Sequence, residues 1–140
     1  ITSAEPVMLK DPQHWQDVID SMAKVIYGKK GTGQRLRRGL TYTLAGKSGT
    51  AQVVGIAQGE KYDANALKER QLDHALFIGF APIEDPRIAV AVVVENGEHG
   101  SSVAGPIVRE MIDAWMHKIQ AAEKAKAAAE KQLKESGDHV

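Results

Sequence analysis

A pair of apolar segments joined by a short turn constrains the fold of this chain more than any other feature. Residues 74–80 are almost wholly apolar, and residues 87–95 are rich in valine, which is typical of a strand buried on both faces. The connection between them, residues 81–86, holds two prolines and an aspartate, which favour a turn. The pattern predicts two neighbouring antiparallel strands.

Helices are predicted on both sides of these strands. Asp11 is placed to cap the first helix with Pro12 in its first turn, and Gly28 is placed to end it. Ser101 or Ser102 is placed to cap the last helix, and the chain's two tryptophans and two phenylalanines are expected in the core. The apolar residues at helical spacing are Trp15, Val18, Ile19, Met22 and Ile26 in the first helix, and Ala104, Ile107, Val108, Met111, Trp115 and Ile119 in the last.

A further strand is predicted before the hairpin, over residues 41–54, with interruptions at Gly46 and Gly49. The order of helix, three strands and helix indicates an α+β fold, an antiparallel sheet with helices packed on it. We expect residues 1–120 to form the folded part. Residues 121–140 are dominated by Ala, Lys and Glu, so we expect a tail that has nothing to bury.

Composition excludes several kinds of function. Eighteen basic side chains balance eighteen acidic ones, so no net field attracts nucleic acid, and the absence of cysteine excludes thiol catalysis and cysteine-based zinc sites. The histidines are scattered without metal-ligand spacing, so neither a metal nor a cofactor is expected. The longest apolar run, residues 88–94, is far shorter than the about 20 residues of a membrane helix. Residues 1–6 contain neither an initiator methionine nor a signal peptide, so we expect part of a longer protein.

Chemistry is concentrated in residues 46–52, with the sequence Gly-Lys-Ser-Gly-Thr-Ala-Gln. In a strand, Ser48 and Thr50 project to the same face, so both hydroxyls are able to meet one carboxylate. Lys47 adds positive potential, and Gly49 lets a substrate backbone approach closely. A backbone N–H at the edge of this strand would stabilise an oxyanion.

Two other readings of this segment compete. A nucleotide-binding P-loop would need a glycine five positions before Gly46, where Thr41 stands. It would also need a helix directly after Lys47, whereas residues 51–54 continue a strand pattern, so we reject the P-loop. A glycine-containing turn with exposed polar residues remains an equal alternative for a match of only four residues.

A resemblance that extends well beyond the four-residue motif favours a substrate-binding strand over a turn. Lys-Ser-Gly is the third motif of penicillin-binding proteins and serine β-lactamases. Residues 45–53 resemble the corresponding strand of the penicillin-binding protein 2 family, the elongation-specific class B transpeptidases of Gram-negative rods. The resemblance covers residues 11–117. Its further blocks are His14-Trp15, Gly31-Thr32-Gly33, Phe80-Ala81-Pro82, residues 88–97 and residues 103–107.

The resemblance implies the later part of a transpeptidase domain that acylates a serine with a peptidoglycan stem peptide and passes the acyl group to a neighbouring amine. Lys47 would then supply charge and a contact in the proton network. Ser48 and Thr50 would hold the terminal carboxylate, and the backbone N–H of Thr50 would form half of the oxyanion hole. The substrate-binding residues would be Ser48, Gly49, Thr50, Ala51 and Gln52.

The same resemblance implies partners and a location. The partners would be the stem peptide, β-lactam antibiotics, the upstream part of the same domain, and the glycosyltransferase and scaffold proteins of the elongation machinery. The location would be the periplasmic face of the bacterial inner membrane, with the membrane anchor outside this chain. A related D,D-carboxypeptidase or β-lactamase and a non-catalytic peptidoglycan-binding or sensor module remain alternatives.

The nucleophile is expected outside this chain. The segment from Ser21 to Lys24 fits S-x-x-K, but the helical wheel turns both side chains away from the apolar stripe and towards solvent. No S-x-N motif is present, so we expect the chain alone to be inactive. The basic cluster of Arg35, Arg37 and Arg38 is expected to be a solvated loop, with contact to anionic glycan or lipid as the minor alternative.

Overall fold

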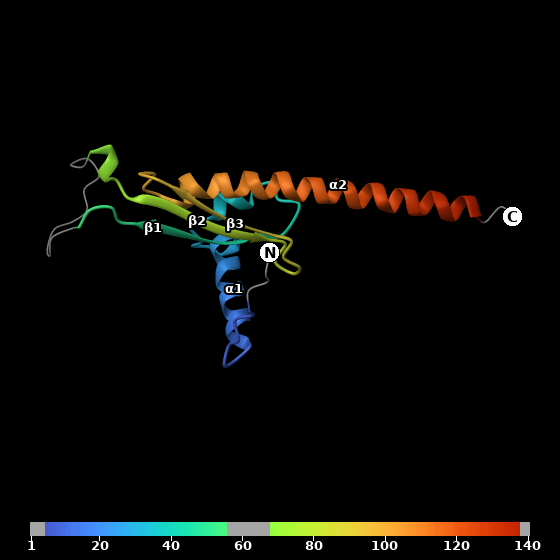
Figure 1. Ribbon diagram of the computed structural model, residues 1–140, viewed down its shortest axis with the longest axis horizontal. Helices are drawn as coiled ribbons and strands as arrows, with labels where there is room; N and C mark the ends of the chain where they lie inside the picture. Colours follow the sequence, from blue (N-terminus) through green and yellow to red (C-terminus); the bar gives the residue numbers. More distant parts are fainter. Residues whose placement is uncertain (1–4, 56–67, 138–140) are drawn as a thin grey trace.

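The computed structural model describes residues 5–55 and 68–137 (Figure 1). Three short turns, η1 (Gln34–Arg37), η3 (Glu69–Gln71) and η4 (Gly100–Ala104), accompany the main elements. The main elements in chain order are helix α1 (Gln13–Tyr27), strands β1 (Ala45–Ala51), β2 (His74–Ala81) and β3 (Ile88–Val94), and helix α2 (Gly105–Gly137).

The three strands form one antiparallel sheet in the order β1-β2-β3. Phe77 lies at the centre of the register, opposite Ser48 on one side and Val92 on the other. Helix α2 runs along one face of the sheet, and α1 projects from the other side, roughly across the strands (Figure 1). The predicted α+β fold and the β2–β3 hairpin are therefore confirmed.

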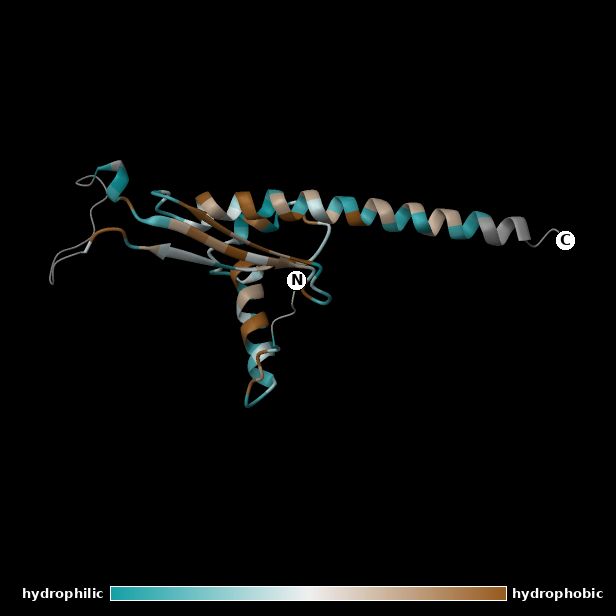
Figure 2. Cartoon of the chain, viewed as in Figure 1, coloured by the Kyte–Doolittle hydropathy of each residue, from teal (hydrophilic) through white to brown (hydrophobic). Residues whose placement is uncertain are grey.

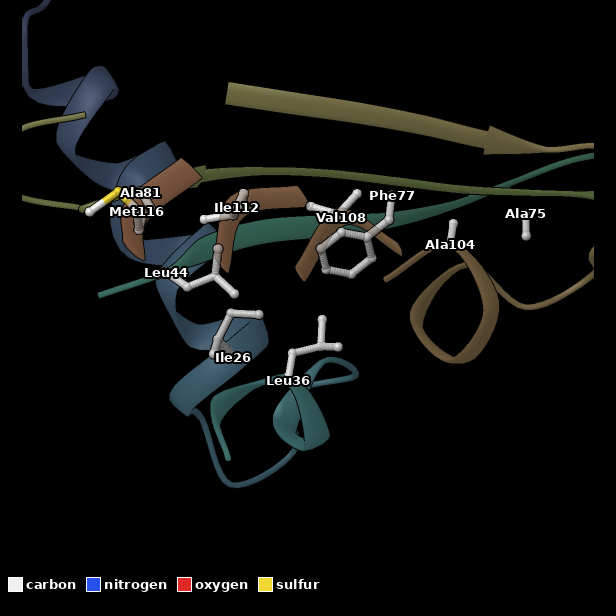
Figure 3. Close-up of a cluster of buried hydrophobic side chains, with 10 residues drawn as sticks. All are labelled: Ile26, Leu36, Leu44, Ala75, Phe77, Ala81, Ala104, Val108, Ile112 and Met116. Carbon is white, nitrogen blue, oxygen red and sulfur yellow. The ribbon is translucent and has the colours of Figure 1, made fainter. Parts of the chain in front are cut away.

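The core lies where β2 and the first half of α2 meet the end of α1 (Figure 3). The largest side chains that are fully removed from solvent are Phe77, Ile26, Leu44, Ile112 and Val108. Leu36 in η1 joins them, although the arginines on either side of it were predicted to lie in a solvated loop. Burial of one leucine thus anchors an otherwise polar segment to the core.

The buried face of α2 differs from the predicted one. Ala104, at the end of η4, and Val108, Ile112 and Met116 follow one another at four-residue spacing and form the buried ladder. By contrast, Trp115 is 45% exposed, and Ile107 and Met111 are also largely exposed. The expected stripe was right for Ala104 and Val108 and wrong for Ile107, Met111 and Trp115, because two apolar rows run along this helix and only one of them faces the sheet.

The first turns of α1 do not reach the core. Trp15 is 48% exposed and Val18 is 49% exposed, whereas Ile26 near the end of the helix is fully buried. The prediction that both tryptophans lie in the core was therefore wrong. An amphipathic stripe indicates that a helix has an apolar face. It does not indicate which turns of the helix pack on the sheet.

The outer face of β3 is also open within the described residues. Ala89 and Ala91 are exposed, and Val93 is 59% exposed, while the alternate residues of this strand face α2 and are half-buried. The expectation of burial on both faces is wrong for this chain, since α2 covers only one face of β3. Figure 2 shows the brown, apolar colouring of β2 and β3.

The helix termini follow the sequence in part. The side chain of Asp11 accepts a 2.8 Å hydrogen bond from the Gln13 N–H, but Pro12 and not Asp11 stands at the cap position of α1, and Gly28 ends the helix. Neither Ser101 nor Ser102 caps α2, because both lie inside the η4 turn that leads into it. That part of the prediction was wrong.

Strand β1 is shorter than predicted and continuous through both glycines. A Cβ at Gly46 would lie 2.6 Å from Cε1 of Phe77, so the absence of a side chain lets the phenyl ring pack on the strand. The glycine therefore permits close packing and does not break the strand.

Helix α2 continues far past the sheet, and its residues 121–132 are all exposed. Figure 2 shows that this projecting half is coloured mainly as polar or weakly apolar. Within residues 5–55 and 68–137, neither α-helix has the combination of length and apolar character needed to cross a membrane.

Candidate active site

The Lys-Ser-Gly-Thr segment lies in β1, at the edge of the sheet. Within the part of the chain that the structure describes, β1 pairs only with β2, so the other side of its backbone is open to pairing. Residues 47–51 lie in the strand, and no helix follows in residues 52–55, which agrees with rejection of the P-loop.

The strand separates Lys47 from the two hydroxyls. Lys47 lies opposite Ile78, whereas Ser48 lies opposite the buried Phe77, so their side chains project from opposite faces. The exposed Lys47 bends back to donate a 2.6 Å hydrogen bond from Nζ to the carbonyl oxygen of Ser48. The ammonium group is thereby held close to the motif backbone.

Ser48 and Thr50 share a face, as the alternation predicts, because they lie opposite Phe77 and Ala75. Oγ of the half-buried Ser48 lies 3.3 Å from Oγ1 of Thr32. Thr50 is exposed, and its Oγ1 donates to the carbonyl oxygen of Glu98 at 3.3 Å. Each hydroxyl thus has a weak protein partner at the long end of the hydrogen-bond range.

A groove of about 440 Å³ opens beside the start of the motif, between the end of α1, the following turn and β1. No carboxylate lies among its described lining residues, so the groove is positively charged. The polar side chains that line it are Ser21, Lys24, Lys30, Thr32, Lys47 and Ser48.

The structure places Thr32, Ser21 and Lys24 beside the motif, which sequence reasoning did not foresee. Thr32 belongs to the Gly-Thr-Gly block at residues 31–33, and this block was the available signal. Ser21 and Lys24 are exposed, as predicted, and Ser21 Oγ donates a 2.7 Å hydrogen bond to the carbonyl oxygen of Asp17. Their presence in the groove depends on the fold, since 23 positions separate Lys24 from Lys47.

The remaining motif residues lie beyond this groove. Thr50 and Ala51 are exposed at the end of β1, and Gln52 follows the last residue of the strand. Gly49 is half-buried. The structure thus gathers Lys47 and Ser48 at the groove and leaves the end of the motif open along the strand.

The arginine cluster occupies η1. Arg35, Arg37 and Arg38 are exposed and line a separate hollow of about 580 Å³ together with Tyr27 and Tyr42. In residues 5–55 and 68–137, no group of three or more histidine, aspartate or glutamate side chains is arranged to hold a metal ion.

Comparison with known proteins places this arrangement in a family. Residues 7–113 match the family model described as the penicillin binding protein transpeptidase domain. The chain is similar to the peptidoglycan D,D-transpeptidase MrdA of Acinetobacter baumannii, with 49% identity over 104 residues that cover 74% of this chain and 15% of the relative. MrdA of Escherichia coli K12 is 39% identical over 103 residues, which cover 74% of this chain and 16% of the relative.

Solved structures agree. The structure of Pseudomonas aeruginosa penicillin-binding protein 2 in complex with WCK 5153 has a TM-score of 0.65 and 43% identity, covering 82% of this chain and 22% of that one. The structure of a complex between Helicobacter pylori penicillin-binding protein 2 and MreC has a TM-score of 0.58 and 31% identity. The match covers 74% of this chain and 17% of that one. The chain thus spans about one sixth of the length of the curated relatives named here. On the family match, the sequence identity and the shared fold together, this chain belongs to the penicillin-binding protein transpeptidase domain family.

Proposed function

We propose that this chain supplies the substrate-binding strand of a serine-type peptidoglycan D,D-transpeptidase that β-lactams inhibit. The observation that carries the proposal is the position of the motif. Lys47 and Ser48 border a positively charged groove, and the strand that holds them has an open backbone edge. An extended peptide with a terminal carboxylate fits such a site, because it can pair with a sheet edge and meet a cation at its end.

In this proposal the stem peptide lies antiparallel or parallel along the free edge of β1. The ammonium group of Lys47 attracts the terminal carboxylate, and the hydroxyls of Ser48 and Thr50 exchange their long contacts for hydrogen bonds to it. Gly49 lets the peptide approach, and the backbone N–H of Thr50 donates to the oxyanion. Ala51 and Gln52 extend the binding edge.

The proposed reaction is acyl transfer through a serine that lies outside these residues. Its oxygen attacks the carbonyl carbon of the penultimate D-alanine, the terminal D-alanine leaves with a proton, and an amine of a neighbouring peptide then displaces the serine. Ser21 is a poor candidate because it is exposed and its hydroxyl is engaged with the helix backbone. The absence of S-x-N from the sequence supports the same view.

We further propose that the complete protein acts at the periplasmic face of the bacterial inner membrane. The Helicobacter pylori relative forms a complex with MreC. A scaffold protein and a glycosyltransferase of cell elongation are accordingly the proposed partners, together with peptidoglycan.

Labelling of the complete protein with a fluorescent penicillin tests this function. Lys47→Ala is expected to lower the acylation rate constant about 100-fold, because it removes a charge that stabilises the developing oxyanion and anchors the carboxylate. Lys118→Ala, an exposed lysine on α2, is the matched control and should acylate like the wild type. Equal acylation of Lys47→Ala and Lys118→Ala would overturn the proposal.

Product analysis separates the alternatives. Release of D-alanine with formation of a cross-linked dimer supports a transpeptidase. Release without cross-linking indicates a carboxypeptidase, rapid hydrolysis of the penicillin indicates a β-lactamase, and a complete lack of label indicates a non-catalytic module.

A further inference from the structure

A loop behind the motif packs directly on the backbone of β1. Gly100, the first residue of η4, is buried, and a Cβ built on it would lie 2.6 Å from the carbonyl oxygen of Gly49. The same Cβ would lie even closer to the carbonyl oxygen of Leu76, which is the register partner of Gly49 in β2. Since real Cβ atoms essentially never come this close, only glycine fits here without movement of the loop or of the strand backbone on which it packs.

The same loop also holds the next residue of the motif. The carbonyl oxygen of Glu98 accepts the 3.3 Å hydrogen bond from Thr50 Oγ1, and the Glu98 N–H donates to the carbonyl oxygen of Asp73 at 2.8 Å. Residues 98 and 100 therefore contact two successive motif residues, Thr50 and Gly49. The loop links them to the residue that precedes β2.

The backbone of this loop is held in an unfavourable conformation. Asn96 and Glu98 have φ values of 57° and 58°, in the left-handed region, which asparagine tolerates but which costs a glutamate free energy. Asn96 is fixed by a 3.0 Å hydrogen bond from its N–H to His74 Nδ1 and by a 2.9 Å bond from Nδ2 to the carbonyl oxygen of Leu72. Such conformations persist only where the surroundings enforce them, and they concentrate at functional sites.

We infer that residues 98–100 are a positioning element for the Gly49–Thr50 peptide of the motif, with Gly100 as its principal positioning residue. The inference rests on the proposed function, in which the Thr50 N–H of this peptide is the oxyanion donor. Donors of this kind act only when they are held within a few tenths of an ångström of the productive geometry. Gly100 contacts no substrate and acts through the backbone that it supports.

Gly100→Ala in the complete protein tests this inference. The added methyl group would collide with the carbonyl oxygens of Gly49 and Leu76, so the loop and the Gly49–Thr50 peptide must move apart. The rate constant of penicillin acylation is therefore expected to fall about 10- to 100-fold, while the dissociation constant of the non-covalent complex changes little. Gly97→Ala is the matched control in the same loop. The three atoms nearest to its Cβ would be side-chain atoms of Val94, Ala75 and Val103, at 3.0 to 3.2 Å. It should lower the unfolding temperature and keep the acylation rate constant.

A second variant tests the same inference if Gly100→Ala does not fold. Glu98→Gly releases the left-handed strain, retains both backbone hydrogen bonds and frees the loop to move. It should unfold at an equal or higher temperature than the wild type and acylate more slowly. A wild-type acylation rate constant in this variant, or in folded Gly100→Ala, would overturn the inference, as would an equal loss in Gly97→Ala. In each case the proposed function would still stand if Lys47→Ala lowers the acylation rate constant as expected and Lys118→Ala does not.

Discussion

The hydroxyl of Tyr42 donates a 2.6 Å hydrogen bond to Oδ1 of Asp113 and so joins the segment before β1 to helix α2. Arg109 completes the pairing, because its Nε donates to Oδ2 of Asp113 at 2.7 Å and its guanidinium group also donates to the carbonyl oxygens of Leu36 and Arg38. Burial, and then the bond to Asp113, raises the pKa of Tyr42 above its usual range. These contacts fix η1 and the approach to the motif strand against the helix.

Removing this hydrogen bond should destabilise the protein. Tyr42→Phe leaves one oxygen of a partly buried carboxylate without its donor, so we expect a loss of about 1 to 2 kcal/mol in the free energy of unfolding. Urea denaturation of the complete protein measures this change in the free energy of unfolding. In a double-mutant cycle with Asp113→Asn, a coupling energy near zero would contradict a direct interaction between the two side chains.

The pairing also predicts an acid-dependent stability. Burial alone would raise the pKa of Asp113, but hydrogen bonds from Arg109 and Tyr42 and the nearby positive charge outweigh burial and place this pKa below its ordinary value. A carboxylate with a lowered pKa stabilises the folded state above its unfolded pKa of about 4, and this contribution is lost as pH falls through the folded pKa. Unfolding measured between pH 6 and pH 3 should therefore show a shallower loss of stability for Asp113→Asn than for the wild type. Parallel curves would refute the assignment.

Close packing at Gly46 predicts a cost for the smallest possible side chain. In Gly46→Ala the methyl group would lie 2.6 Å from Phe77 Cε1 and 2.8 Å from the carbonyl oxygen of Ile78, so the ring or the strand must shift. We expect a loss of about 1 to 3 kcal/mol in the free energy of unfolding. Gly55→Ala is the control, since a Cβ there meets nothing within 4 Å, and it should change stability by less than about 0.5 kcal/mol.

Covalent labelling should discriminate between Ser21, which fits an S-x-x-K motif, and a nucleophile outside this chain. Because Ser21 is exposed and hydrogen-bonded to its own helix, Ser21→Ala in the complete protein should still acquire a penicillin label. Mass spectrometry of the labelled wild-type protein should find the adduct outside residues 1–140. An adduct on Ser21, or loss of labelling in Ser21→Ala, would move the nucleophile into this chain.

Local patterns in the sequence were sufficient to predict most of the secondary structure. The valine-rich run of β3 and the proline-containing turn before it specified a hairpin, and Asp11 and Gly28 marked the ends of α1. The alternation of side chains placed Ser48 and Thr50 on one face of β1. Each of these features depends on residues that are close in the sequence, where backbone preferences act directly.

Features that depend on distant residues were not predictable in this way. The choice between the two apolar rows of α2 depends on how the helix lies on the sheet, and Ile112 was therefore missed. The pairing of Tyr42 with Asp113 spans 71 positions. Thr32 joined the site because the chain after α1 returns to the motif strand, which no local pattern encodes.

The projecting half of α2 has a consequence for how this helix melts. Residues 121–137 extend the helix by about 25 Å at 1.5 Å per residue, with no sheet beneath them. A free peptide of this length is only marginally helical in water, because the first turn is costly to form. In this protein the turns of α2 that pack on the sheet already supply that nucleus, so residues 121–137 are helical because they continue it. On warming, this part of α2 should fray from its C-terminal end at temperatures well below the one at which the sheet unfolds.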